Sequence, residues 1–494
     1  MAWPAGRLVA SAFDATAIRQ VFGSARIWRI IGFTIGQATL STTVTMAVAV
    51  PGAWLVGRHR FRAKRLLVAL WSAPFALPAV VIGASLLALL PEHVERSLFS
   101  IVFAHVLFNV GMVVRVLGDA WERSDERIEQ AAATLGAGPF RRNALMLRVL
   151  APEAASLAGL VMALCLTSFA IISILGGPRL GSIETEIHRQ TFQTLRIDRA
   201  AVLAVAQLAL VSTALVATTR RRSGSSPERR TLLRMPRIGG GAIISALSIV
   251  TLLPIVVLAD RATRWPGNTS VGDRSAGAFA ALMEPTRGSG LLLAPIDSLF
   301  TSVRAAAMAT ALAVLLALIT VAAARGSRFV DVFATLPLAV SGVTLGLGTL
   351  LAFASSPVAW RSNWWMVPLT QAMVAFPFAL RVLRPALDSI DSRLRDVAAT
   401  LGASPLHVLT RVVAPLMRAP LCAAAALAGA VAMGEFGATS FLVRERMETM
   451  PVAIGVLTSR PGDRLQTQAA ALCVILAAVT MALTATAGLA GRRR

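Results

Sequence analysis

One polar stretch occurs twice in this chain, and each copy lies between apolar runs that are long enough to cross a bilayer, which takes about 20 residues. The first copy spans residues 115–152 and the second spans residues 381–415. A constant offset of 266 residues aligns them and pairs Gly136 with Gly402. The repeat predicts a chain of two homologous halves, each with the same polar loop between its membrane spans.

Each copy predicts a helix, a bend and a second helix. The first helix is rich in Ala and Leu and ends at Gly136 or Gly402, which can adopt the left-handed conformation that closes a helix. The second helix restarts at Pro139 in the first copy and at Pro405, behind the N-cap residue Ser404, in the second. Small side chains on the first helix of each polar loop would let another backbone approach closely, so we interpret the loop as a docking surface for a partner. These small residues are Ala131, Ala132, Ala133, Ala398 and Ala399.

The composition predicts a polytopic membrane protein. Hydrophobic residues make up 56% of the chain, and charged residues make up 15%, where about 25% is usual. The net charge of +23 comes from arginines clustered beside apolar runs, which is the positive-inside arrangement. The chain has no tyrosine, and its tryptophans lie mostly in or beside the apolar runs, so we expect the lipid bilayer as its partner and no nucleic acid.

Eleven transmembrane helices are expected, five in the first half and six in the second, because only helices satisfy their own backbone in lipid. With the basic clusters inside, the odd number places the N-terminus outside and the C-terminus in the cytoplasm. The expected spans are 27–56, 66–90, 97–117, 154–175, 200–219, 242–259, 298–324, 330–354, 364–383, 420–442 and 467–490.

These spans divide the chain into four parts. Residues 1–26 form an N-terminal segment without a span, and residues 27–219 form the first half, with its polar loop at 118–152. Residues 220–241 hold seven arginines and form a cytoplasmic linker, and residues 242–491 form the second half, with its polar loop at 384–418.

The sequence contains no pattern for catalysis or for a bound cofactor. The only lysine, Lys64, does not lie in a phosphate-binding loop, so we expect no ATPase site in this chain. The five histidines are scattered, and the three cysteines lie in apolar runs, which is typical of packing residues and not of a metal site. We therefore expect a transport protein and not an enzyme.

Polar residues inside the spans are candidates for a translocation path. Glu435 lies well inside an apolar run, where a charge is costly enough to need a role or a partner. The corresponding stretch of the first half has Ser168 at this place, and Asn109 shares a helix face with His105. Helix packing is the alternative explanation for all four side chains.

The pattern acidic residue-x-Ala-Ala-x-Leu-Gly, followed by a proline at the start of a span, resembles the cytoplasmic coupling loop of binding-protein-dependent ABC importer permeases. In that family the loop inserts into a cleft on the ATPase subunit. The position of the family's glutamate falls on Gln130, beside Glu129, in the first copy and on Asp396 in the second. Neither copy has the glutamate itself, and the first is three residues longer between Gly136 and Pro152.

The resemblance implies an all-α fold of two tandem type I (MetI-like) permease halves in the bacterial inner membrane. It also implies two copies of an ABC ATPase, which bind the ATP, and one extracytoplasmic solute-binding protein as partners. The family begins each half with a span like 242–259, and none precedes Ile27, so either the first half lacks it or the start codon lies upstream. The residues expected to couple to the ATPase are Glu129, Gln130, Ala131, Ala132, Gly136, Asp396, Ala398, Ala399, Gly402 and Pro405.

Fusion of both halves in one chain resembles the importers for thiamine and for iron(III). The segment from Thr167 to Gln190, with Gly176-Gly177 and Ile183-Glu184, looks more like the thiamine branch. We therefore expect thiamine or its phosphates as the solute, and iron(III) next. An ion-coupled secondary transporter that uses Glu435 is the alternative from another class.

Overall fold

The computed structural model describes residues 2–218, 233–235, 237–264, 276–285, 288–323, 340–353, 363–443 and 447–491. These residues are almost all helical. Outside the helices, the described regular structure is a parallel pairing of two short strands, β1 (His59–Arg60) and β2 (Leu233–Arg234). The expected all-α polytopic fold is confirmed.

Contacts divide the chain into two compact units, Ala12–Thr263 and a unit made of Met1–Ser11 with Arg264–Arg494. The first of these contains α14 (Arg237–Arg261), which packs against α3, α4, α5 and α7. The sequence assigns this span to the second half, as 242–259, whereas the contacts group it with the first. Most of the expected linker at 220–241 lies outside the described residues.

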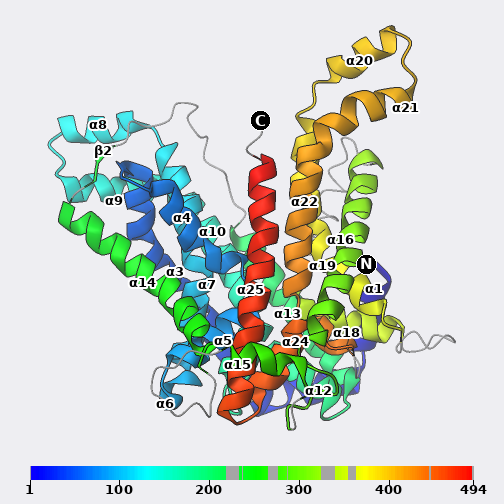
Figure 1. Cartoon of the computed structure of the whole chain (residues 1–494). Helices are drawn as coiled ribbons and strands as arrows, with labels where there is room; N and C mark the ends of the chain where they lie inside the picture. The colour runs from blue at the N-terminus through cyan, green and yellow to red at the C-terminus, as the bar shows by residue number, and fades with distance from the viewer. Residues whose placement is uncertain are drawn as a thin grey trace. The chain divides into compact units, whose positions relative to one another are not determined.

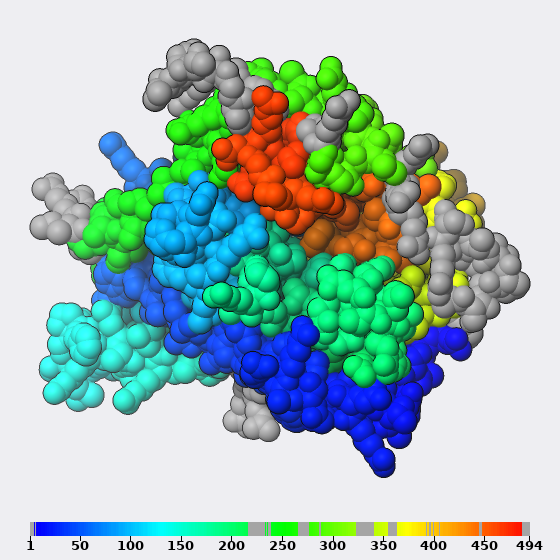
Figure 2. All heavy atoms as spheres, turned by 90° about the horizontal axis from the view of Figure 1, so that it is seen from below, coloured from blue at the N-terminus to red at the C-terminus, as the bar shows by residue number. Residues whose placement is uncertain are grey.

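The unit Ala12–Thr263 is a helical assembly (Figure 1). Its helices before α14 are α2 (Ala15–Phe22), α3 (Ala25–Arg58), α4 (Lys64–Ala76), α5 (Ala79–Leu89), α6 (Glu92–Glu95), α7 (Leu98–Glu122), α8 (Glu126–Thr134), α9 (Pro139–Val149), α10 (Ala151–Leu166), α11 (Phe169–Leu175), α12 (Ile183–Phe192) and α13 (Ile197–Thr218). Figure 2 shows α2, in blue, beside the green segment around α12 and the start of α13. There Arg196 and Arg199 both donate hydrogen bonds to Oε1 of Gln20.

Glycines let α7 pack closely against both α3 and α4 in this unit. A Cβ at Gly57 would lie 2.4 Å from Cβ of Trp121, and one at Gly111 would lie 1.8 Å from the carbonyl oxygen of Trp71 in α4. In lipid, helices associate through such close backbone packing because no hydrophobic driving force brings them together. The pairs Gly57 with Trp121 and Ser41 with His105 show that α3 and α7 run parallel.

The second unit is built around α16, α19 and α22, which contact one another, and α25, which packs against α22. After the N-terminal α1 (Ala2–Ala12), its described elements are α15 (Gly277–Ala280), η1 (Ala281–Met283), α16 (Asp297–Ala323), α18 (Gly342–Ala352), α19 (Met366–Asp388), α20 (Ser392–Thr400), α21 (Pro405–Val408), the π-helical turn η4 (Leu409–Val413), α22 (Ala414–Gly434), α23 (Thr439–Leu442), α24 (Met450–Ser459) and α25 (Asp463–Gly491). Figure 1 shows α20 and α21 at the end of this unit where α25 finishes, and α24 and α15 at the opposite end.

Eight helices of the described chain are long and apolar enough to cross a membrane, and the number rises to ten if each of two bent pairs is one span. The bends are 101° between α4 and α5 and 62° between α9 and α10. About eleven spans were expected. One of them, 330–354, is described only over residues 340–353, which contain α18.

Candidate functional site

The first polar loop contains the helix, bend and helix that the sequence predicts. Asp125 caps α8 by accepting a hydrogen bond from the amide of Arg127, at 2.9 Å. The helix closes at Gly136, whose φ of +80° is left-handed, and the amide of Ala137 donates back to the carbonyl of Ala132 at 2.9 Å. Glycine is needed here because other residues are strained at this φ. Helix α9 then begins at Pro139.

The second polar loop repeats this geometry. Asp391 accepts a hydrogen bond from the amide of Arg393 at 2.9 Å, Gly402 has a φ of +78°, and the amide of Ala403 donates to the carbonyl of Ala398 at 3.0 Å. The two bends are therefore equivalent bond for bond. The predicted coupling residues Asp396 and Ala399 lie in α20 and Pro405 begins α21, but the side chains of these three lie outside the described part of the chain.

Large apolar side chains stand exposed at equivalent positions of the two loops. Leu135 is 87% exposed and Leu401 is 82% exposed, just before the glycines. Phe140 is 87% exposed and Leu406 is 69% exposed, just after the prolines. The two loops thus present matching apolar side chains at their bends. Sequence reasoning missed these four residues, although the offset of 266 pairs them.

The predicted coupling residues of the first loop divide between exposed and buried positions. Gln130 and Ala131 are exposed and Ala132 is partly buried, so Gln130 and Ala131 are accessible to a partner. Glu129 is only 3% exposed and forms an ion pair with Arg58, the last residue of α3. Glu129 therefore contacts the body of its own unit.

The first half has a break in its span at the end of α10. The carbonyls of Cys165 and Leu166 lie at this end, where a helix leaves its last carbonyls without helical partners. Buried side-chain amides bond to both: Gln37 of α3 donates to Cys165 at 3.1 Å, and Gln207 of α13 donates to Leu166 at 2.7 Å. Ser168 follows the break, is partly buried and precedes α11 without capping it through its side chain.

The second half breaks its span at Glu435, directly after α22. The carboxylate accepts hydrogen bonds from the amides of Ala438 and Thr439, at 2.7 and 2.8 Å, and from the hydroxyl of Thr439 at 2.5 Å. A Cβ at Gly342 would lie 2.8 Å from Oε1 of Glu435, so α18 passes close to the carboxylate. Glu435 is 7% exposed, and its hydrogen bonds hold the turn between α22 and α23.

Asn109 lies in the core of the first unit, between α3 and α7. It is 1% exposed, and its amide nitrogen donates to the carbonyl of His105 at 2.9 Å. Nδ1 of His105 lies 2.9 Å from the hydroxyl of Ser41. The contact between Ser41 and His105 holds α3 and α7 together, whereas the hydrogen bond of Asn109 stays within α7.

A family model now gives this arrangement its context. The model for the binding-protein-dependent transport system inner membrane component matches residues 49–223 and again residues 242–491. The two matches together contain both polar loops and both breaks. This chain belongs to that family.

Two curated relatives match the permease over most of its length, and a third matches part of it. The thiamine transport system permease protein ThiP of Brucella abortus (strain 2308) is 30% identical, over 95% of this chain and 88% of its own. ThiP of Escherichia coli (strain K12) is 26% identical, over 87% of this chain and 83% of its own. The putative 2-aminoethylphosphonate transport system permease protein PhnV of Salmonella typhimurium (strain LT2) is 34% identical over 30% of this chain and 55% of its own.

Membership makes this chain a multi-pass inner-membrane subunit of a transport system that also comprises an ABC ATPase and a solute-binding protein. The identity of the ThiP relatives extends through both halves, whereas the PhnV match covers less than a third of the permease. The alignment with ThiP therefore covers both halves of the chain.

The segment that resembles the thiamine branch forms α11, α12 and their connection. Gly177 has a φ of +57° in that connection, and Glu184 and Ile187 are buried in α12. Burial raises the pKa of Glu186, but hydrogen bonds from Arg189 and Gln190 and the charges of Arg189 and Arg26 together bring it below its usual value. Glu186 is therefore ionised at neutral pH and ties α12 to α3.

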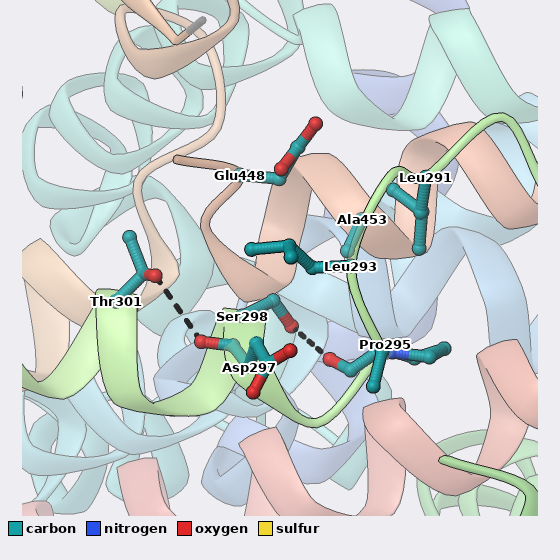
Figure 3. A pocket seen from close by; sticks show the side chains of 9 residues that line it. Leu291, Leu293, Pro295, Asp297, Ser298, Thr301, Glu448 and Ala453 are labelled. Atoms are coloured by element: carbon teal, nitrogen blue, oxygen red, sulfur yellow. Dashed lines mark hydrogen bonds between the residues drawn. The ribbon is translucent and has the colours of Figure 1, made fainter. Parts of the chain in front are cut away.

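One small pocket lies in the second unit between the start of α16 and the start of α24. Figure 3 shows the carboxylates of Asp297 and Glu448 among mostly apolar neighbours, with Thr301 donating to the carbonyl of Asp297 at 3.1 Å. The pocket has room for about one water molecule, which is far less than a small-molecule site needs. We therefore do not assign the solute to this pocket.

Replacing Glu435 with glutamine tests whether the carboxylate only holds its turn. Glutamine has one acceptor oxygen in place of two, so we expect a loss of stability of about 1–3 kcal/mol and a clear drop in uptake, with ATPase binding unchanged. Thermal unfolding in detergent and uptake by reconstituted vesicles measure the two effects. Thr439→Val is the matched control, because it removes the hydroxyl bond and keeps the carboxylate. A larger loss of uptake in Glu435→Gln than in Thr439→Val at equal stability would assign Glu435 to the path, and unaltered uptake would reduce it to packing.

Proposed function

We propose that this permease forms the solute pathway of an ABC importer and that each polar loop docks one copy of the ATPase. The observation that carries the proposal is the repeated bend, which exposes the same apolar pair in each half: Leu135 with Phe140, and Leu401 with Leu406. Two equivalent docking surfaces on one chain support a complex with two ATPase copies, to which we add one solute-binding protein. With a single lysine outside any phosphate-binding loop, the chain depends on these copies for ATP hydrolysis.

The proposal places both polar loops and the C-terminus in the cytoplasm. Two features support this orientation. Within the second unit, α20 and α21 lie at the end where α25 finishes (Figure 1), so the loop and the C-terminal end share one side. The sequence also ends in Arg492, Arg493 and Arg494, and basic residues next to a span favour the cytoplasmic side.

The proposed solute is thiamine or one of its phosphates. The ThiP relatives support it because their identity runs through both halves of the chain. The path is proposed to pass close to the two breaks, at Ser168 and Glu435, where irregular backbone in a membrane is tolerated only beside protein or a cavity. An ion-coupled transporter is less well supported, since the carboxylate of Glu435 accepts its hydrogen bonds from its own turn.

Valine at Gly136 or at Gly402 should uncouple ATP hydrolysis from uptake. Both glycines have left-handed φ values and open space around them, so the change strains the bend without a clash, by about 1–2 kcal/mol. Gly138→Val is the matched control, since Gly138 is equally open and has an ordinary φ of −66°. We expect normal insertion in all three variants and a lower uptake per ATP hydrolysed in the first two only. Normal coupling in Gly136→Val and Gly402→Val would contradict the docking role.

A cysteine at Ala403 should react with a membrane-impermeant thiol reagent only from the cytoplasmic face. Ala403 follows the bend of the second loop and is partly exposed. The measurement compares intact cells with inside-out vesicles in a variant whose native cysteines, Cys165, Cys422 and Cys473, are replaced by alanine. Labelling of intact cells would place the loop outside and overturn the proposed orientation.

Uptake measurements should show that thiamine is carried. Cells that lack this permease should regain uptake of labelled thiamine when the chain is supplied with its ATPase and binding protein. Excess thiamine phosphate should compete if phosphates share the path, and an iron(III) chelate should not. Restored uptake of iron(III) without uptake of thiamine would move the solute to the second expectation.

A further inference from the structure

Arg58 joins three elements of the first unit at the base of its polar loop. It is the last residue of α3, and its guanidinium pairs with the carboxylate of Glu129 in α8. The same guanidinium donates a hydrogen bond to Oδ1 of Asn143 in α9, at 2.6 Å. We propose that this set of contacts, the Arg58 clamp (Arg58, Glu129 and Asn143), fixes the position of the first loop and so orients it for docking to the ATPase. This inference rests on the proposed function.

The clamp is buried enough to act on position. The side chain of Glu129 is 4% exposed and that of Arg58 is 12% exposed. A planar guanidinium that bonds two acceptors fixes orientation as well as distance. When one partner of such a buried pair is removed, the other charge is left without compensation, so the local structure must rearrange.

The end of α3 is itself held firmly. Gly57, the residue before Arg58, lies against Trp121, and a Cβ there would lie 2.7 Å from the carbonyl oxygen of Gly118. Trp121 packs in a buried apolar cluster with Met146 of α9 and Leu150, which lies between α9 and α10. This apolar cluster holds α9, and the Arg58 clamp connects α8 to the end of α3. Through Arg58 the loop is therefore tied to the first span of its own unit.

The second loop differs from the first at the position of Glu129. The offset of 266 that aligns the two copies places Arg395 at that position. An arginine there has no carboxylate that could pair with a guanidinium as Glu129 pairs with Arg58. A change at Arg58 should thus affect docking through the first loop and leave the second loop as an internal reference.

Site-specific cross-linking to the ATPase tests this asymmetry. A photo-crosslinking amino acid is placed at Leu135 or at Leu401 in the complete transporter with its own ATPase subunit. In Arg58→Glu and in Glu129→Arg we expect cross-linking at position 135 to fall about fivefold or more, and cross-linking at position 401 to be unchanged. The charge swap Arg58→Glu with Glu129→Arg should restore position 135 to within about twofold, because it rebuilds the pair. Glu129→Gln, which keeps the shape and removes the charge, should give a smaller loss of the same kind.

The outcomes separate the clamp from the proposed function and from general misfolding. If neither position cross-links in the parent transporter, the docking function itself fails. If both do and Arg58→Glu leaves position 135 unchanged, the clamp has no positioning role. If a single change lowers both positions equally and the charge swap restores neither, the pair serves stability alone. A selective loss at position 135 with recovery in the charge swap supports the proposal.

Discussion

The structure depends on the requirement that every backbone N–H and C=O group inside a bilayer find a partner within the protein. Both halves interrupt a span after the polar loop, so both must meet this requirement where helix carbonyls and amides are freed. The first half uses side-chain amides from neighbouring spans, with Gln37 and Gln207 donating to the carbonyls at the end of α10. The second half uses Glu435, whose carboxylate accepts the amides at the start of α23. In the first half, side chains of other helices therefore bond the freed carbonyls at the break. In the second half, a side chain of the turn itself bonds the freed amides.

The sequence predicts those features of the fold that have local causes. Apolar run length and the glycine bends are local, and the helices and the closures at Gly136 and Gly402 agree with the prediction. The grouping of α14 with the first unit depends on packing between distant segments, and no periodicity in residues 242–259 reports it. The angle of 101° between α4 and α5 could not be predicted either, although Pro78 and the proline inside α4 mark where the chain bends.

The candidate site was predictable as a motif and less so as a set of contacts. The repeat shows which residues are equivalent, and it places Gln130 and Asp396 at one position. It does not show that Glu129 turns inward to Arg58, 71 positions earlier in the chain, since that pairing depends on how α3 and α8 meet. Glu435 was singled out because a charge in a span is costly, and the structure shows how the charge is compensated. Its role in the path remains a proposal.

The two loops also join their spans differently, and this bears on how movement at a loop reaches the membrane. Helices α9 and α10 meet at a bend of 62°, so a push on the first loop is transmitted through an angle. In the second half α21 continues through the π-helical turn at Leu409–Val413 into α22 as one helical span. A π-helical turn leaves a weaker hydrogen-bond pattern within a continuous helix and often marks a functional position. The first loop is thus connected to its break through a bent pair of helices, and the second loop through a nearly continuous helix. If each loop docks one ATPase copy as proposed, equal movements of the two copies would displace Ser168 and Glu435 by different routes.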